Sequence, residues 1–385
     1  MNQEFLLKNR KVAIVHDFLN QSGGAEKVLE ALTEIFPEAP IFTLLYDPKK
    51  MRGKFKGADI RPSFLQKFPK FLRKRYRYLL PLMPTAPETF NLRDYDLVIS
   101  SSSAFAKGII VKPKTLHICY CHSPMRYGWD WNEKYIEEQG LGQKKKLCAR
   151  LLMNYVRMWD RVAADRPDSF IANSKVTQQK IKKYYGRDSV VVYPPVEISK
   201  VEFLENFQSS TLGKEYFLIV SRLSPYKKIE LAIETFNKLD LPLWIVGEGS
   251  PKYTKYLKSI AVQKIKFLGW ANDAELKKHY AGCRAFIFPG EDDFGIAPVE
   301  AMSFGRPVIA LRRGGATETV SEGVSGEFFD EPVLEVMADA IRRFIEKEKE
   351  YDPVKIRELA ARFSKEVFVG NIKKAIEEII QNNSQ

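Results

Sequence analysis

The chain has 385 residues, of which 45% are hydrophobic and 28% charged, and its formal net charge is +13. The length suits two domains, and the composition excludes a disordered chain. No run approaches the roughly 18 apolar residues of a membrane span, and the opening segment MNQEFLLKNRKVAIVHDF lacks the apolar core and cleavage site of a secretory leader. We therefore expect a cytoplasmic protein whose surplus of cations favours phosphates, nucleic acid or an acidic membrane surface as partners.

The sequence alternates strand-like and helix-like patterns in two series. In the first, the buried-strand candidates are KVAIVHDF (11–18), PIFTLL, DLVISSSS, LHICYC and SFIANS, while GGAEKVLEALTEIF (23–36) has helical spacing. The second series begins at YFLIVSRL (216–223), continues with a helix from about Lys228, and includes PLWIVGEG, IKFLGW, AFIFPG and RPVIALRRGG. The segment between them, 190–215, contains two prolines and a polar stretch and is interpreted as an interdomain connection.

This alternation predicts parallel sheets with crossover helices, so the expected fold class is α/β. We expect two Rossmann-like, doubly wound domains. Such sheets bind ligands at the C-terminal ends of their strands, which makes a central cleft between the domains the natural place for chemistry.

The segment EDDFGIAPVE (291–300) concentrates carboxylates where a helix is predicted to begin. The amides around Gly295 could hold a phosphate oxygen at the helix N-terminus. Carboxylates instead suit a sugar or ribose, because an ionised carboxylate accepts two O–H bonds from neighbouring hydroxyls. Asp292 would lie before the helix and Glu300 about a turn and a half inside it. The alternative is that these acidic residues only complement the helix dipole.

Two other segments follow predicted strands. In SRLSPYKKIE, Arg222 and Lys227 could bracket a diphosphate, with arginine supplying a planar fork and lysine a point charge, or they could be solvated surface cations. In NQSGGAEKVLE, Gly23 and Gly24 would let a ligand approach the backbone at a helix N-terminus, although the pattern is not G-x-G-x-x-G and is weak alone.

The chain has four histidines and four cysteines. His122 follows LHICYC, so its imidazole should emerge at the ligand-binding edge of the sheet, whereas a lone histidine is more often structural. No comparable argument applies to the other histidines, His16, His117 and His279. No metal-ligand spacing is present, and we expect buried thiols at Cys119, Cys121, Cys148 and Cys283.

Motifs in both halves carry a family resemblance that covers essentially the whole chain. The second half contains SRLSPYKKIE, IVGEG, the stretch from IKFLGWANDAE to RRGGATETV, and FS before the last helix. As a set, these resemble the retaining glycosyltransferases of family 4, which have the GT-B fold. The first half, with GGAEKV, RYLLPLMPTAPETFNL, DLVISSSSAFAKG and YCHSPMRYGWD, is most similar to bacterial mannosyltransferases that build O-antigen or capsular polysaccharide.

The resemblance implies a domain for each half and a role for each matching residue. The acceptor-side domain would span 1–195 and the nucleotide-sugar domain 196–364, with the helix in 365–385 returning to the first domain. Arg222 and Lys227 would hold the donor diphosphate and Glu300 the nucleotide ribose. The remaining donor contacts would come from Gly23 and Gly24, His122 near the transferred sugar, amides around Phe294, Gly295 and Ile296, and Asp273 near the base.

One position departs from the family pattern. The first of the family's paired glutamates is aspartate here, Asp292, whose side chain is one methylene shorter. Either Asp292 reaches a sugar hydroxyl through a local shift, or Glu291 takes its place.

The resemblance implies a retaining transfer of a hexosyl group, mannose from GDP-mannose, to a hydroxyl of a lipid-linked or polysaccharide acceptor. A front-face mechanism with His122, Arg222, Lys227 and Asp292 as the catalytic set would need no divalent metal and no cofactor beyond the nucleotide-sugar substrate. The alternatives are a UDP- or ADP-hexose donor, a glycan phosphorylase, or a nucleic-acid-binding protein. The last leaves the carboxylates unexplained, so no nucleic acid partner is expected.

A basic segment predicts membrane contact. Residues 61–80, RPSFLQKFPKFLRKRYRYLL, hold seven Lys or Arg and no acid. In a helix opened by Pro69, one face would carry Phe71, Leu72, Tyr76 and Leu79, so residues 64–80 could lie on an anionic leaflet at the inner face of the cell membrane. The alternative is a core-facing stripe with a solvated basic back.

Overall fold

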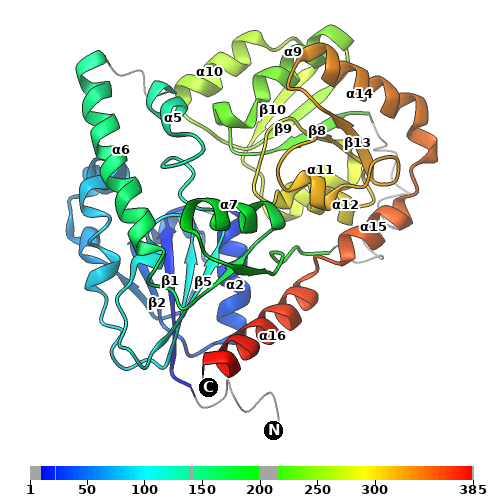
Figure 1. Cartoon of the computed structure of the whole chain (residues 1–385). Helices are drawn as coiled ribbons and strands as arrows, with labels where there is room; N and C mark the ends of the chain where they lie inside the picture. Colours follow the sequence, from blue (N-terminus) through cyan, green and yellow to red (C-terminus); the bar gives the residue numbers. More distant parts are fainter. Residues whose placement is uncertain (1–9, 22, 139–141, 199–214, 384–385) are drawn as a thin grey trace. The chain divides into compact units, whose positions relative to one another are not determined.

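The computed structural model describes residues 10–21, 23–138, 142–198 and 215–383 (Figure 1). The segment used to predict that no leader is present lies partly outside this range. Most of the interdomain connection also lies outside it. The chain divides into two compact units, Met1–Pro195 together with Phe368–Gln385, and Val196–Val367.

The first unit is built on a seven-stranded parallel sheet of order β3-β2-β1-β4-β5-β6-β7. Its strands are β1 (Val12–Leu19), β2 (Ile41–Tyr46), β3 (Ile60–Pro62), β4 (Leu97–Ser102), β5 (Leu116–Cys121), β6 (Ser169–Ala172) and β7 (Ser189–Val191). The central strands are buried on both faces, which explains their continuous apolar runs.

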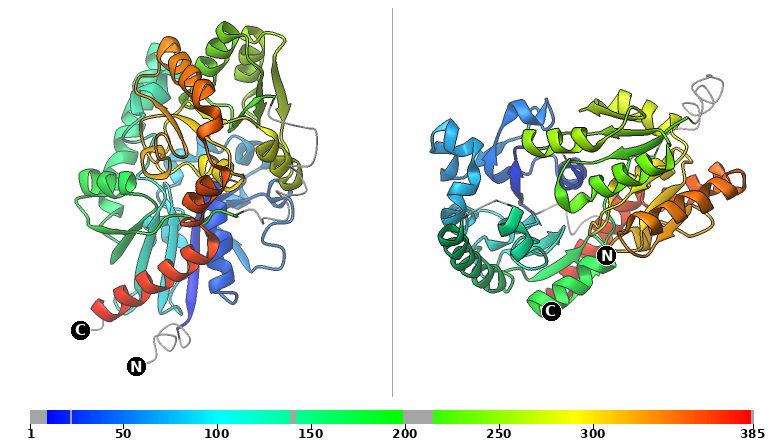
Figure 2. Two further views of the ribbon diagram at one scale, coloured as in Figure 1. Left: turned by 90° about the vertical axis from the view of Figure 1, so that its right-hand side faces the viewer. Right: turned by 90° about the horizontal axis from the view of Figure 1, so that it is seen from above.

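Seven α-helices and four short 3₁₀ helices accompany this sheet in the described residues. The α-helices are α2 (Gly24–Ile35), α3 (Pro48–Met51), α4 (Lys70–Lys74), α5 (Asn132–Glu138), α6 (Gln143–Ala163), α7 (Lys175–Tyr185) and α16 (Lys365–Asn383). The 3₁₀ helices are η1 (Phe64–Lys67), η2 (Tyr76–Leu82), η3 (Pro87–Thr89) and η4 (Ala106–Gly108). The last helix, α16, lies alongside α2 (Figure 2). It packs into the same core cluster as α2 and β1, with Phe368, Ile372 and Ile376 buried.

The second unit is built on a six-stranded parallel sheet of order β10-β9-β8-β11-β12-β13. Its strands are β8 (Phe217–Val220), β9 (Leu243–Val246), β10 (Ile265–Gly269), β11 (Phe286–Phe288), β12 (Val308–Leu311) and β13 (Gly326–Phe329). Its helices are η5 (Pro225–Lys227), α9 (Ile229–Leu239), α10 (Pro251–Ile260), α11 (Asp273–Gly282), α12 (Ile296–Ser303), α13 (Ala316–Thr319), α14 (Leu334–Lys347), η6 (Glu348–Glu350) and α15 (Pro353–Ala361). In the core, Phe217 of β8 meets Phe236 of α9 and Phe344 of α14, with ring centroids 5.1 and 5.9 Å apart.

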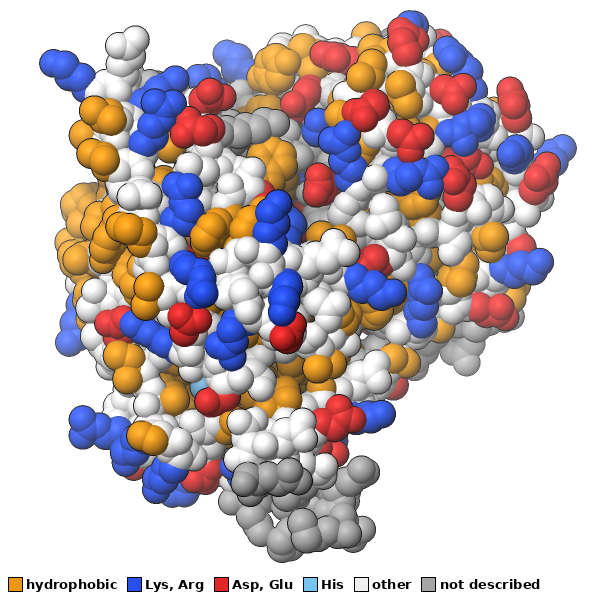
Figure 3. Space-filling model, viewed as in Figure 1, with side chains coloured by type: hydrophobic (Ala, Val, Ile, Leu, Met, Phe, Trp, Pro, Cys, Tyr) orange, Lys and Arg blue, Asp and Glu red, His pale blue; other side chains and the backbone are white. Residues whose placement is uncertain are grey.

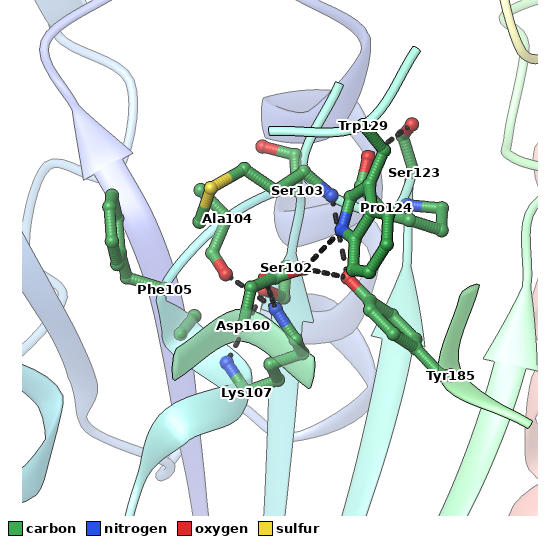
Figure 4. Close-up of polar contacts among 12 residues, drawn as sticks. Ser102, Ser103, Ala104, Phe105, Lys107, Ser123, Pro124, Trp129, Asp160 and Tyr185 are labelled. Atoms are coloured by element: carbon green, nitrogen blue, oxygen red, sulfur yellow. Dashed lines mark hydrogen bonds and ion pairs between the residues drawn. The ribbon is translucent and has the colours of Figure 1, made fainter. Parts of the chain in front are cut away.

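A buried ion pair joins α6 to η4 within the first unit (Figure 4). The ammonium of Lys107, in η4, pairs with the Asp160 carboxylate of α6, and both side chains are almost fully enclosed. Trp129 Nε1 and Tyr185 Oη each donate to Asp160 Oδ2 at 2.8 Å, and Lys107 Nζ also donates to the Ala104 carbonyl at 2.8 Å. Because every partner of Asp160 lies on one side of α6, this network determines which face of the helix points inward.

Two sequence-based expectations were wrong in detail. Residues 64–80 do not form one amphipathic helix, because α4 is only five residues long and η2 follows it with Pro81 inside. The face expected to meet lipid is divided, since Leu79 is buried and the Tyr76 ring lies 5.4 Å from that of Phe18, whereas Phe71 is exposed. Of the four cysteines, three are buried as expected, but Cys148 is exposed on α6.

Within the described residues, no helix combines the length and the apolar character needed to cross a membrane.

Candidate active site

The second unit places its candidate residues at the point where its strand order reverses. Strands β8 and β11 are neighbours, and the chain leaves β8 toward α9 on one side and β11 toward α12 on the other. In a doubly wound sheet, ligands bind outside the carboxyl ends of the strands at this reversal. Lys227 follows β8, and residues 291–296 follow β11, so the sheet topology brings these two segments together.

The two segments meet through an ion pair. Lys227 Nζ pairs with the Asp292 carboxylate, and both side chains are mostly buried. The loop backbones also touch, because a Cβ added at Gly290 would lie 2.8 Å from the Lys227 Cα, so no larger residue fits there without a shift. Asp292 is thus placed to orient Lys227, and the three ammonium hydrogens of a lysine allow it to contact a phosphate at the same time.

The start of α12 lies in the same loop. Gly295 is its N-cap and has a left-handed backbone with φ of 82°, a conformation that favours glycine. Ile296 is the first helical residue, whereas the Phe294 side chain is buried against Phe363 with ring centroids 5.4 Å apart. A ligand here could therefore contact the backbone of Phe294 but not its ring.

Glu300 lies inside α12 and is held by a tyrosine. Tyr280 Oη, from α11, donates to Glu300 Oε2 at 2.7 Å. Burial raises the pKa of Tyr280 well above its ordinary value, and the nearby Glu300 carboxylate adds to this, so the hydroxyl keeps its proton and remains a donor. Glu300 is only partly buried and carries a carboxylate in a defined position.

The remaining candidates of the second unit are more exposed. Arg222 is exposed and its Nη2 donates to Tyr226 Oη at 3.1 Å. Glu291 is partly exposed in the loop before α12. Asp273 is the exposed first residue of α11, directly after the capping residue Asn272, which accepts from the Glu275 amide at 3.0 Å. That position also suits an acidic residue that complements the helix dipole.

An open pocket of about 650 Å³ lies at the ends of β9 and β10, and its lining includes Leu223, the residue after Arg222. Its lining includes the glycine loop Gly247–Gly249, two lysines of α10 and the end of β10, namely Lys255, Lys258 and Phe267–Gly269. Gly247 and Gly249 belong to the IVGEG motif of the family resemblance, and neither they nor the two lysines were among the predicted site residues. The glycine turn of RRGG was also not assigned, although the Gly315 amide donates to the Asp292 carbonyl at 2.8 Å.

In the first unit, the neighbouring strands β1, β4 and β5 bring three polar side chains into a row of hydrogen bonds. His16 ends up opposite Ser101 across the β1–β4 pairing, and His122 follows β5 on the other side of β4. Ser101 Oγ lies 3.0 Å from His16 Nδ1 and 2.7 Å from His122 Nε2. A hydroxyl has one hydrogen, so Ser101 donates to one imidazole and accepts from the other, which couples their tautomers.

Burial lowers the pKa of His122 from 6.5 to about 3, and the nearby His16 contributes in the same direction. His122 is therefore neutral at physiological pH. A neutral imidazole can exchange hydrogen bonds with a sugar hydroxyl, but it does not supply a positive charge.

The glycine pair begins α2. Gly23 is the exposed N-cap and Gly24 the first helical residue. Glu26 is buried over this end of the helix, with Oε1 3.7 Å from His16 Nε2, and a Cβ added at Gly23 would lie 3.3 Å from Glu26 Oε2. His16, Ser101 and Glu26 were not predicted as site residues. Only the β1–β4 register places His16 opposite Ser101, and only the folded position of α2 places Glu26 beside His16.

Within the described residues, no group of three or more His, Cys, Asp or Glu side chains is arranged to hold a metal ion.

The two doubly wound parallel-sheet units are those of the GT-B class of α/β glycosyltransferases, which confirms the predicted fold class. Residues 22–200 match the model of Glycosyltransferase Family 4, and residues 201–366 match that of Glycosyl transferases group 1. The chain therefore belongs to the group 1 glycosyltransferases, with a family 4 N-terminal half.

Individual proteins and solved structures are similar to this chain along most of its length. The chain is 23% identical over 396 residues to the alpha-1,3/1,6-mannosyltransferase ALG2 of Dictyostelium discoideum, covering 88% of this chain and 90% of the relative. The structure of Anabaena HepE in complex with UDP-glucose has a TM-score of 0.69 and 19% identity, covering 96% of this chain and all of that one. The sucrose-phosphate synthase of Thermosynechococcus elongatus has a TM-score of 0.68 and 15% identity, covering 96% of this chain and all of that one.

Proposed function

We propose that this glycosyltransferase moves mannose from GDP-mannose, with retention of configuration, to a hydroxyl of a lipid-linked or polysaccharide acceptor. The observation that carries the proposal is the pairing of Lys227 with Asp292 beside the start of α12, at the strand-order reversal of the second unit. This arrangement offers a cation and backbone amides for phosphates next to carboxylates for hydroxyls. The choice of mannose is supported by the similarity to a mannosyltransferase along most of the chain.

In the proposed reaction, the bond between the sugar anomeric carbon and the diphosphate oxygen breaks while the acceptor oxygen bonds to the same carbon. The acceptor proton passes to the departing diphosphate on the same face of the sugar. Arg222 and Lys227 would stabilise the charge that develops on the diphosphate, and Glu300 would accept hydrogen bonds from the ribose. Catalysis would then depend on positioning and on charge stabilisation.

Asp292 has two parts in this proposal. Its pairing with Lys227 would orient the ammonium toward the diphosphate, and its carboxylate would also accept a hydrogen bond from a sugar hydroxyl. Glu291, in the same loop, is the alternative partner for the sugar. His122, neutral and held by Ser101, would contact the transferred sugar from the first unit.

A panel of donors tests the proposal directly. Thermal shifts are measured with GDP, UDP and ADP and with their hexose derivatives, followed by nucleotide release in the presence of a lipid-diphosphate-linked glycan. We expect the largest stabilisation with GDP and GDP-mannose, and NMR of the product should show the anomeric configuration of the donor. Preference for a UDP- or ADP-hexose would reject GDP-mannose, and an inverted product would reject the front-face mechanism.

The location proposed for the enzyme is the inner face of the cell membrane, where a lipid-linked acceptor would be found. The basic residues of segment 64–80 support this location through their charge.

A further inference from the structure

Helix α6 exposes an apolar stripe along its length. Its members are far from buried, with exposed fractions of 59% for Leu147, 64% for Leu151, 45% for Tyr155, 57% for Met158 and 62% for Val162. Their spacing of four, four, three and four residues places them on one face of the helix, and the stripe extends about 22 Å. We name these five residues the α6 stripe. An apolar row of this length is unusual on the surface of a protein that functions without a partner.

The α6 stripe is exposed because the opposite face of the helix is occupied. Met153, Val156, Asp160 and Ala163 are the buried residues of α6. Asp160 is bound to Lys107, Trp129 and Tyr185 inside the unit (Figure 4). Turning the stripe inward would expose this network and break the buried ion pair, so the outward orientation belongs to the folded state.

Helix α6 carries six cations and a single acid, the buried Asp160. The basic residues of α6 are Lys144, Lys145, Lys146, Arg150, Arg157 and Arg161. Two of them have acidic partners from outside the helix, since Arg150 pairs with Glu133 and Arg161 with Asp165. A helix with an exposed apolar face and a basic flank has the composition that anionic lipid surfaces bind.

The apolar surface continues on the neighbouring segment. Leu79 and Met83 lie in the same core cluster as Val156 and Leu152 of α6, so residues 70–82 pack beside the helix. On their outer side, Phe71 and Tyr78 are largely exposed and Leu82 less so. Figure 3 shows hydrophobic side chains gathered along this edge of the molecule, over α6 and the adjoining segment, with Lys and Arg side chains among them.

We propose that the α6 stripe is the membrane-inserting element of this enzyme and that it enters an anionic lipid leaflet together with Phe71 and Tyr78. The surface combines apolar side chains with an excess of cations, which complements a leaflet of acidic lipids. A second copy of the chain fits poorly, because two such surfaces would bring like charges together. The proposal deepens the membrane location given above, but it rests on no step of sugar transfer and is tested without activity.

The exposed Cys148 provides a local probe. It lies next to Leu147 on α6, and the other three cysteines are buried. A maleimide carrying an environment-sensitive fluorophore should therefore label this position in the folded full-length protein. We expect a blue shift and brighter emission with vesicles containing phosphatidylglycerol, and little change with pure phosphatidylcholine. Vesicle binding without a change in emission would show that α6 stays outside the apolar layer, which overturns the proposal.

A variant pair separates insertion from simple charge attraction. Leu151→Gln with Met158→Gln removes two members of the α6 stripe, leaves the charge unchanged and retains residues that favour helix. The matched control is Val333→Gln with Val354→Gln, two side chains that are each 51% exposed in the second unit. In flotation assays with phosphatidylglycerol vesicles, we expect the stripe variant to bind about tenfold more weakly or worse and the control to bind like the wild type. Circular dichroism verifies that both remain folded.

Three results would overturn the proposal. Equal vesicle binding by wild type and stripe variant would assign the contact to charge alone. Absence of wild-type binding at low salt would show that no lipid surface is recognised. Sedimentation that shows a lipid-free dimer in the wild type and a monomer in the stripe variant would assign the surface to a second copy.

Discussion

The ammonium of Lys227 pairs with the carboxylate of Asp292, 65 positions further along the chain. The two residues follow the neighbouring strands β8 and β11, so the sheet and not the local sequence joins them. The pair holds a cation at the place where a doubly wound sheet receives phosphates.

Lys227→Gln should weaken the binding of a nucleoside diphosphate. A charge-assisted hydrogen bond contributes about 1.5–3 kcal/mol, which corresponds to roughly tenfold or more in Kd. Isothermal titration calorimetry measures the change, and Lys238→Gln, which breaks the exposed pair of Lys238 with Glu335, is the matched control. Equal losses in both variants would indicate a general effect of charge, and an unchanged Kd in Lys227→Gln would remove this lysine from the diphosphate site.

Glu300→Ala should lower kcat/KM by a factor that corresponds to about 1.5–3 kcal/mol, because it removes a carboxylate proposed to bind the ribose. The fold should survive, since Glu300 is only partly buried. Tyr280→Phe, which removes the hydroxyl that donates to Glu300 at 2.7 Å, is the control and should cause a smaller loss. If the purified Glu300→Ala enzyme keeps its kcat/KM, Glu300 has no part in donor binding.

Excess EDTA should leave the transferase activity intact. Arg222 and Lys227 are proposed to neutralise the leaving diphosphate, so the reaction would not depend on a divalent ion. Initial rates of nucleotide release are compared with and without the chelator, with added Mg²⁺ or Mn²⁺ as the restoring condition. Activity that disappears in EDTA and returns with metal would mean that an ion performs this neutralisation.

Asp160→Leu should lower the free energy of unfolding by about 3–5 kcal/mol, because it leaves the buried ammonium of Lys107 without its charged partner. Adding Lys107→Met in the same protein should recover part of this loss, since no buried charge then remains. Urea denaturation measures both variants. Strictly additive losses would show that the two residues do not depend on each other.

Stability should fall between pH 7 and pH 5, partly through His117. Burial lowers the pKa of His117 from 6.5 to about 3, so over this range the unfolded chain takes up a proton that the folded protein does not. The free energy of unfolding therefore falls by about 2 kcal/mol as the pH drops through the unfolded pKa of 6.5. Above that pKa, His117 is neutral in both states and this part of the stability is fully present. His117→Gln should therefore lose about 2 kcal/mol less than the wild type between pH 7 and pH 5, as measured by urea denaturation. From pH 7 to pH 8 the free energies of unfolding of the two proteins should change nearly in parallel. If they also change in parallel down to pH 5, His117 does not cause the loss of stability.

The sequence by itself determined the fold class. Strands buried on both faces must be continuously apolar and crossover helices must be amphipathic, so KVAIVHDF, LHICYC and YFLIVSRL were recognisable as strands of parallel sheets. The short strands β3, β7 and β13 were not predicted. Their sequences, IRP, SVV and GEFF, lack the continuous apolar run by which the other strands were recognised.

The tertiary structure decided which polar residues meet. Lys227 and Asp292 were both candidates from sequence, but their pairing depends on the adjacency of β8 and β11. Similarly, Ser101 shows no local signal, and only the register of β1, β4 and β5 places it between His16 and His122. The sequence also did not show which face of α6 points inward, because both of its faces carry apolar residues. The buried contact between Asp160 and Lys107, two residues 53 positions apart, determines which face points outward, and such long-range contacts form only when the whole unit has folded.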